Sequence, residues 1–378
     1  MLGLPHDLFQ LYIPTTIVTG KFDAMVTAMN LFVVALLGAG AMSGFLVFRR
    51  ARLLRALALI TAGVAGTVVA LRLLLALIVD PSYTKDDVVR QMHKATRGNT
   101  TVVVRPTDEP GMAADVAPAR LSRLAHLRAR GSLRIGYDPD NLPFSFFNAD
   151  HELVGFDVEI AEALADALGL IAVFVPVTWS ELPDMLADGR IDVMPGTWYR
   201  PNWLGRLRLS RAYLDGTMGF ATLDARRHEF ASIAALQRSR GLRIGVPLDR
   251  RQVEASIAHY FGPAEVDLVT IEFWKPYFAG EHPEIDAFLM PAENASGWTL
   301  LHPRYSVVVP QPDPVRIPSA MGLPLDAAVL AMHIDEWLVY ADSAGLLRRA
   351  YDYWVLGQGA EPHARRWSVL HDVLHWGH

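Results

Sequence analysis

Residues 131–170 read GSLRIGYDPDNLPFSFFNADHELVGFDVEIAEALADALGL, and their pattern indicates the class of the fold. The apolar run after the first glycine, over 133–137, predicts a buried strand. The residues that follow favour a loop, because Pro143 has no backbone N–H to give to a neighbouring strand. The last part predicts a helix that begins near Gly155 and ends at Gly169, since its apolar residues recur at helical spacing. Such an order is typical of the start of an α/β domain, in which ligands bind at the carboxyl ends of the strands.

The same alternation continues along the chain. A strand is expected over 171–177, then a helix that ends at Gly189, then a third strand over 191–194. Alternating strands and helices predict a mostly parallel sheet. The glycine–strand pattern repeats from Gly241, where the sequence reads GLRIGV. Two α/β units in succession predict two lobes with a ligand cleft between them.

The composition of the 378 residues restricts the classes of function. A formal net charge of −5 gives no electrostatic basis for binding nucleic acid. Without cysteine, the chain can form neither a disulfide nor a thiol nucleophile nor a cysteine-ligated metal centre. His371, His375 and His378 have a helical spacing that could chelate a metal. We favour a docking or interfacial helix over 361–378 instead, and we expect no cofactor and no metal.

The first 80 residues have the pattern of a membrane region. Residues 25–48 contain no charged side chain and residues 56–79 contain one, so both are long and apolar enough to cross a bilayer. Four arginines lie between them, over 49–55, and positive residues stay on the cytoplasmic side. The sequence therefore predicts a two-helix transmembrane hairpin, with everything after residue 80 outside the cytoplasm. A linker over 81–117 is expected to join the hairpin to the α/β region.

Four segments of the α/β region resemble the family 3 extracellular solute-binding proteins, two-lobed receptors that capture amino acids and small polar solutes. They are LRIGYDPDNLPFSF from residue 133, HELVGFDVEIAEALADALG from 151, ELPDMLADGRIDVMPGT from 181 and RLRLSRAY from 206. The resemblance covers about 118–360 and implies a two-lobed periplasmic-binding-protein type II fold of the α/β class. It places lobe 1 at about 131–220 plus the C-terminal part, and lobe 2 at about 221–320.

The same resemblance implies how the protein works and where. Lobes of this kind close on a ligand about a hinge. Together with the hairpin, the family implies a protein of the bacterial inner membrane whose solute-binding domain lies in the periplasm or outside the cell.

Two charged positions of the family's amino-acid site differ in this chain. Family members that bind α-amino acids share a T-x-x-R element, whose arginine forks onto the ligand carboxylate. These two positions are Arg200 and Trp203 here, and the family's ammonium-binding aspartate corresponds to Pro291. The resemblance implies either that Arg200 replaces the missing guanidinium and Glu293 the missing carboxylate, or that the pocket binds a different ligand or none.

The candidate ligand-binding residues lie at the predicted strand ends. They are Asp138, Asn141 and Phe144 after the first strand, Gly196, Thr197 and Trp198 after the third, and Arg200 and Glu293 from the family pattern. Backbone N–H groups at a turn such as 195–197 often bind carboxylates. Each side chain also has an ordinary structural interpretation. Asp138 and Asn141 could form only an Asx turn, Phe144 could belong to the lobe core, and Arg200 could form a surface ion pair.

We favour a non-enzymatic, membrane-anchored solute-binding protein that works in uptake or sensing. Its expected partners are a small solute such as an amino acid or a dicarboxylate, the lipid bilayer, and a membrane transporter subunit. The transporter is suggested by the N-terminal residues, which resemble the tail of a dicarboxylate-type cation symporter. One alternative is an enzyme similar to cyclohexadienyl dehydratases, with Glu293 or Asp138 as general acid in a dehydration–decarboxylation. The other is a non-binding structural module of a split symporter fusion.

Overall fold

The computed structural model describes residues 85–94, 100–106, 112–118, 121–247, 253–271 and 274–360, with a few isolated positions between 31 and 66. The chain divides into two compact units, residues 1–82 with 364–378 and residues 83–363. Among the described residues, no helix is both long and apolar enough to cross a bilayer. The predicted spans over 25–48 and 56–79 lie outside the described residues, apart from those isolated positions, and so does the predicted helix over 361–378.

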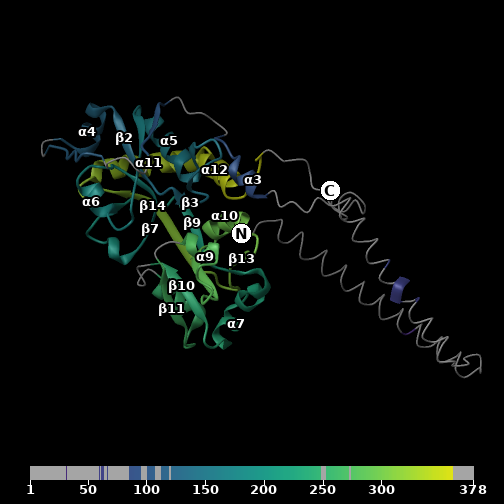
Figure 1. The fold of residues 1–378 in the computed structure, drawn as a ribbon. Coiled ribbons are helices and arrows are strands. Elements are labelled where there is room, and N and C mark those ends of the chain that lie inside the picture. The colour runs from purple at the N-terminus through teal and green to yellow at the C-terminus, as the bar shows by residue number, and fades with distance from the viewer. Residues whose placement is uncertain are drawn as a thin grey trace, which may run out of the picture. The chain divides into compact units, whose positions relative to one another are not determined.

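The second unit contains the α/β region, and its first lobe is built on a parallel sheet (Figure 1). The strands follow the order β1 (Val102–Val104), β6 (Ile171–Pro176) and β2 (Ser132–Tyr137). An isolated bridge between Ile135 and Val193 leads on to β7 (Met194–Trp198). The crossovers are α5 (Phe156–Leu168) and α6 (Leu182–Ala187). The loops after β2 and β7 therefore lie at the same edge of the lobe.

Shorter elements complete the first lobe. A small antiparallel sheet follows β2 and consists of β3 (Asp140–Asn141), β4 (Ser145–Phe147) and β5 (Leu153–Val154). Four helices come from distant parts of the sequence, namely α3 (Lys85–Arg90), α4 (Arg123–Arg130), α11 (Ala328–Ser343) and α12 (Leu346–Trp354). Helix α11 contacts α4, and α12 contacts α5. The chain thus returns to the first lobe after it has built the second.

The second lobe repeats the strand–helix alternation. Its strands are β10 (Arg243–Pro247), β11 (Asp267–Ile271), β12 (Ala287–Pro291) and β13 (Tyr305–Val308). Its helices are η2 (Asp224–Phe230), α7 (Ile233–Arg238), α8 (Glu254–Phe261), α9 (Trp274–Ala279) and α10 (Ala292–Leu301). β11, β10 and β12 run parallel, which is the pattern expected of crossover units.

Two long strands belong to both lobes. β9 (Leu214–Leu223) pairs with β12 and β13 through its second half and with β14 (Arg316–Leu323) through its first half. β14 in turn pairs with β7 and with β8 (Arg208–Leu209) of the first lobe. The result is a path of strands in the order β11-β10-β12-β9-β14-β7. The two lobes are therefore joined by a pair of antiparallel strands.

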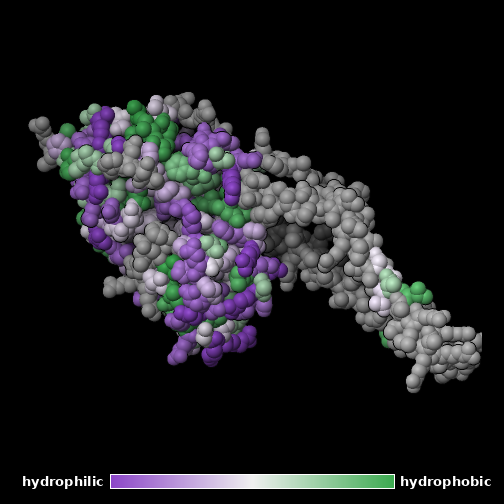
Figure 2. Space-filling view, in the orientation of Figure 1, coloured by the Kyte–Doolittle hydropathy of each residue, from purple (hydrophilic) through white to green (hydrophobic). Residues whose placement is uncertain are grey.

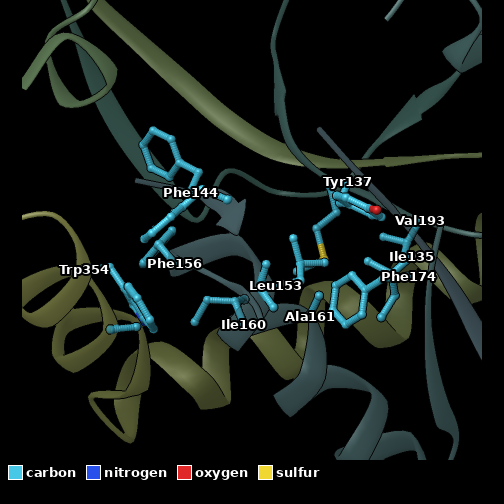
Figure 3. Packing of buried hydrophobic residues seen from close by; sticks show 14 of the residues in the cluster. Ile135, Tyr137, Phe144, Leu153, Phe156, Ile160, Ala161, Phe174, Val193 and Trp354 are labelled. Atoms are coloured by element: carbon cyan, nitrogen blue, oxygen red, sulfur yellow. The ribbon is translucent and has the colours of Figure 1, made fainter. Parts of the chain in front are cut away.

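The core of the first lobe forms around α5. Its residues Phe156, Ile160 and Ala161 are at most 1% exposed and pack among side chains of the sheet and of α12 (Figure 3). Full burial of a side chain the size of phenylalanine contributes roughly 1.5–3 kcal/mol to stability. Away from the core, the face of this unit shown in Figure 2 is mostly hydrophilic.

The predicted α/β alternation is confirmed, although the third strand is shifted and some elements were not predicted. The third strand was expected over 191–194. The observed strand is β7, Met194–Trp198, so it begins where the apolar run ends. The patterns predicted neither α10 nor β14. β14 contains Pro318, a residue that argues against a central strand because it cannot donate to a ladder.

The predicted linker over 81–117 contributes structure to the second unit. Val102–Val104 form β1 and pair in parallel with β6. Val89 and Met92 are buried in the main core, and Asp115 forms an ion pair with Arg130. The segment after residue 118 forms α4, and two arginines of this helix form ion pairs: Arg123 contacts Asp326, and Arg130 contacts Asp192.

Candidate functional site

A cavity of about 780 Å³ lies between the two lobes. Both lobes contribute to its wall, and so does the strand pair β9 and β14. Seven of the eight candidate residues line it: Asp138, Asn141, Phe144, Gly196, Trp198, Arg200 and Glu293. Its volume is within the range of small-molecule sites.

Arg200 follows β7 and precedes the short helix η1 (Pro201–Trp203). Its guanidinium carbon lies 4.5 Å from the centre of the Trp198 ring and 5.9 Å from the centre of the Trp203 ring. A cation over the face of an indole is held by the negative charge of the ring face. The aromatic pair thus fixes the direction of the guanidinium at the cavity wall.

The loop after β2 combines the structural and the functional interpretations. The Asp138 carboxylate accepts hydrogen bonds from its own loop, at the Asp140 N–H, and from the Trp179 indole N–H at 2.8 Å. Burial raises the pKa of this carboxyl. Asp138 therefore forms the expected Asx turn and also lines the cavity. No pattern in the sequence indicated that Trp179, from the next strand–helix loop, would donate to this carboxylate.

Phe144 also has both roles. It is 7% exposed and packs edge-on against Phe156, with ring centres 5.9 Å apart, yet it reaches the cavity. Asn141 reaches across the cleft: its side-chain oxygen accepts a hydrogen bond from Asn294 of α10 at 2.8 Å.

Consecutive residues at the end of β7 face either the cavity or the protein interior. Gly196 has a φ of 69°, and an added Cβ would overlap the Asp157 carboxylate. Thr197 is fully buried, and its hydroxyl donates to the Met194 carbonyl. Its side chain is not part of the cavity wall, whereas Trp198, one residue later, is. Neighbouring residues of a strand point to opposite faces, which explains the difference.

Glu293 lies in the first turn of α10 and is 8% exposed. Its carboxylate accepts a hydrogen bond from the Thr217 N–H of β9 at 3.2 Å. Burial raises the pKa of this carboxyl, and the backbone donors lower it by a smaller amount. The structure thus places an acidic group on the second-lobe side of the cavity, two residues after the family position now held by Pro291.

Sequence reasoning missed Asp157, the second residue of α5. It is 5% exposed, lines the cavity, and accepts a hydrogen bond from the Tyr213 hydroxyl at 2.5 Å. The same hydroxyl accepts from the Gly196 N–H at 2.7 Å. Burial raises the pKa of Asp157 to about 7, and the Tyr213 hydrogen bond opposes this rise. One signal was available: an acidic residue in phase with the buried stripe of a helix, with Ile160 and Ala161 three and four positions on.

Among the residues that the structure describes, no cluster of histidine and acidic side chains has the arrangement of a metal site. The cavity instead combines carboxylates, a stacked guanidinium and tryptophan side chains. Such a wall can bind a small polar molecule through charge-assisted hydrogen bonds.

Comparison with known proteins agrees with this geometry. The family model of bacterial extracellular solute-binding proteins, family 3, matches residues 133–357. The chain belongs to this family. The matched residues of this chain include both lobes and the strand pair between them. All the residues that line the cavity therefore lie in the region shared with the family.

The similar curated proteins differ in kind. Cyclohexadienyl dehydratase of Pseudomonas aeruginosa is 28% identical over 256 residues, which are 67% of this chain and 90% of that protein. The L-cystine-binding protein TcyJ of Escherichia coli is 39% identical over 71 residues, 19% of this chain and 27% of that protein. The first is named for an enzyme activity and the second for binding a solute.

Solved structures share the fold of this chain. The ancestral amino acid-binding protein AncCDT-1, a precursor of cyclohexadienyl dehydratase, has a TM-score of 0.53 at 24% identity and covers 62% of this chain and 100% of its own. A mutant of ArgBP from T. maritima has a TM-score of 0.52 at 19% identity and covers 61% and 98%. The two-lobed fold is therefore shared with amino-acid-binding proteins.

Proposed function

We propose that this family 3 protein captures a small polar or anionic solute between its two lobes, with Arg200 as the principal cation for the ligand. The observation that carries the proposal is the Arg200 guanidinium, held over Trp198 in the wall of the interlobe cavity. A stacked guanidinium loses little freedom on binding, and its planar donors match a carboxylate. It supplies the charge that the family's amino-acid site takes from the position of Trp203.

The acidic side of the cavity supports a solute that also carries a donor or a cation. Asp138 and Glu293 line the same cavity, and burial raises the pKa of both. An ammonium group close to such a carboxyl favours the charged form and lowers its pKa. An amino acid or a related zwitterion fits this wall. Thr197 is left out of the proposed contacts, because its side chain faces away from the cavity.

We further propose that the protein is anchored in a bilayer by residues 25–48 and 56–79, with the solute-binding unit in the periplasm or outside the cell. The charge-free first segment and the arginines over 49–55 support the anchor and its orientation. Membership of an extracellular family supports the location. A membrane transporter subunit is the proposed partner for uptake.

A thermal-shift screen of the full-length protein tests the binding function. The probes are the common amino acids, short dicarboxylates and polyamines. A solute at 100 times its Kd should stabilise the protein by about 2.7 kcal/mol. We expect Arg200→Ala to abolish the shift for any anionic solute, because it removes the guanidinium while leaving the core intact. Arg128→Ala, an exposed arginine on α4, is the matched control and should keep the full shift.

Two results would contradict this assignment. If Arg200→Ala keeps the full shift, the ligand does not depend on this cation. If no probe shifts the parental protein, the non-binding structural module becomes the better interpretation.

One observation favours an enzyme as the second candidate. Glu293 is a buried carboxyl of raised pKa in the cavity wall, and a similar protein is a cyclohexadienyl dehydratase. Dehydration needs a general acid that protonates the departing hydroxyl, and a carboxyl of raised pKa suits that role near neutral pH. Incubation with a cyclohexadienyl acid, followed by chromatography of the aromatic product, tests this. Turnover that Glu293→Gln abolishes would establish the enzyme, whereas binding without turnover would favour the receptor.

A further inference from the structure

A buried hydrogen-bonded tie joins the two lobes beside the cavity. Asn294 of α10 is 1% exposed, and its Nδ2 donates to Asn141 Oδ1 at 2.8 Å and to the Leu142 carbonyl at 2.9 Å. Asn141, at the end of β3, and Leu142, which follows it, belong to the first lobe, whereas α10 belongs to the second. One amide group therefore uses both of its hydrogens across the cleft.

The packing of α10 matches this tie. Gly297 lies one turn after Asn294, and a Cβ at this glycine would lie 2.9 Å from Leu142 Cγ and 3.4 Å from the Leu142 carbonyl carbon. The absence of a side chain lets the helix approach the loop closely. On α9, the Trp274 indole N–H donates to the Asp140 carbonyl at 3.3 Å. Two helices of the second lobe thus contact three consecutive residues of the first lobe, Asp140–Leu142.

We infer that Asn294 is a positioning residue that favours the closed arrangement of the lobes and fixes the Asn141 amide in the cavity wall. The tie consists of protein groups alone, so it can form without a contribution from any solute. Its cost of breaking is limited, because water can replace both hydrogen bonds once the lobes separate. The tie therefore shifts an equilibrium between open and closed lobes and leaves opening possible.

This inference stands apart from the proposed function, because it concerns the lobes and not the identity of the solute. It has a consequence for binding all the same. The fraction of molecules in the binding-competent arrangement scales the apparent affinity for any ligand of that arrangement. Asn294 would therefore change affinity and release without being the main contact of the solute.

The full-length protein permits a direct measurement, because it contains no cysteine. Cysteines introduced at Asp166 on α5 and at Glu254 on α8, both exposed, carry one spin label on each lobe. Pulsed electron–electron distance measurements then report the separation of the lobes without added solute. Asn294→Asp keeps the shape of the side chain but removes the Nδ2 donors.

We expect Asn294→Asp to raise the ratio of open to closed molecules about tenfold, which converts to about 1.4 kcal/mol. The distance distribution should gain a longer component. Thr299→Ala is the control on the same helix, because the Thr299 hydroxyl donates only to the Ser296 carbonyl within α10. This control should leave the distribution unchanged.

A distribution for Asn294→Asp that matches the parental one would overturn the inference. Should that variant be too unstable to measure, Asn141→Ala removes one of the two acceptors from the other side, and an unchanged distribution there would also overturn the inference. With both changes combined, their effects should be non-additive, since the two residues share one contact. A protein that binds no probe in the thermal screen would refute the proposed function and leave these distances untouched.

Discussion

At the scale of single residues, Asp157 gives the protein a buried acid that titrates near neutral pH. Its pKa is raised to about 7 in the folded protein, from an ordinary value of 3.8, because burial disfavours the charged form. The folded state therefore holds the proton more tightly than the unfolded state does. Stability from this group is fully present below about pH 4 and is lost as the pH rises through about 7.

Asp157→Asn should remove this pH dependence. Asparagine keeps an oxygen for the Tyr213 hydroxyl and has no charge to bury. We expect the stability advantage of the variant over the parental protein to grow as the pH rises from 4 to 7. It should reach on the order of 4 kcal/mol at pH 7. Denaturant unfolding followed by tryptophan fluorescence measures it. Asp166→Asn, exposed on the same helix, should run parallel to the parental protein, and a pH-independent difference for Asp157→Asn would disprove the assignment.

Much of the cavity wall could be predicted from single residues. The rule that ligands meet the carboxyl ends of strands brought Asp138, Asn141 and Gly196 to the wall, and the structure places them there. It could not separate Thr197 from Trp198, because a shift of the strand by a few residues decides which side chain faces inward. Trp179 was beyond reach, since its contact with Asp138 depends on how two loops meet in space.

At the scale of elements, the periodic helices were predictable and α10 was not. α5 has one apolar stripe, whereas α10 is buried on more than one side and includes buried Glu293, Asn294 and Gly297. α10 packs against β9, β13 and α3 and also lines the cleft, so it needs no single apolar stripe and the amphipathic pattern is missing. β14 was missed for a related reason: its pairing with β7 and β9 is long-range and outweighs the local preference of Pro318.

The start of α5 provides a test at this scale. Gly155 has a φ of 134°, and a Cβ there would overlap the Phe144 carbonyl oxygen. We expect Gly155→Ala to lower the free energy of unfolding by about 2–4 kcal/mol, because it combines backbone strain with a clash that only a shifted backbone relieves. Denaturant titration of the full-length protein measures the loss.

The other end of the same helix supplies the control. Gly169 also has a positive φ, 68°, but nothing lies within 4 Å of an added Cβ. Gly169→Ala should therefore cost only about 1–2 kcal/mol, the strain of a left-handed residue alone. Equal losses for the two variants would show that the contact with Phe144 contributes nothing.

At the scale of the whole molecule, the proposed anchor predicts one topology. A reporter that is active only outside the cytoplasm, fused after His378, should be active in cells. The reason is the cluster of arginines over 49–55, which holds the turn between the proposed spans on the cytoplasmic side. Replacing these arginines with serine should reduce the signal. A second reporter, active only in the cytoplasm, is fused at the same position. Activity of that reporter instead of the first would exclude this orientation.

The strand pair between the lobes has a consequence for how such a molecule can change. The chain leaves the first lobe along β9 and returns along β14, and the two strands pair side by side where Thr217 faces Arg316. The second lobe is thus an insertion into the first lobe, and the points where the chain leaves and re-enters the first lobe lie next to each other. An inserted lobe of this kind can be replaced as a unit by the corresponding lobe of a related protein. Arg200 and Asp157 belong to the first lobe, whereas Glu293 and Asn294 belong to the second. One exchange would therefore replace the second lobe's half of the cavity wall and leave the first lobe's half in place.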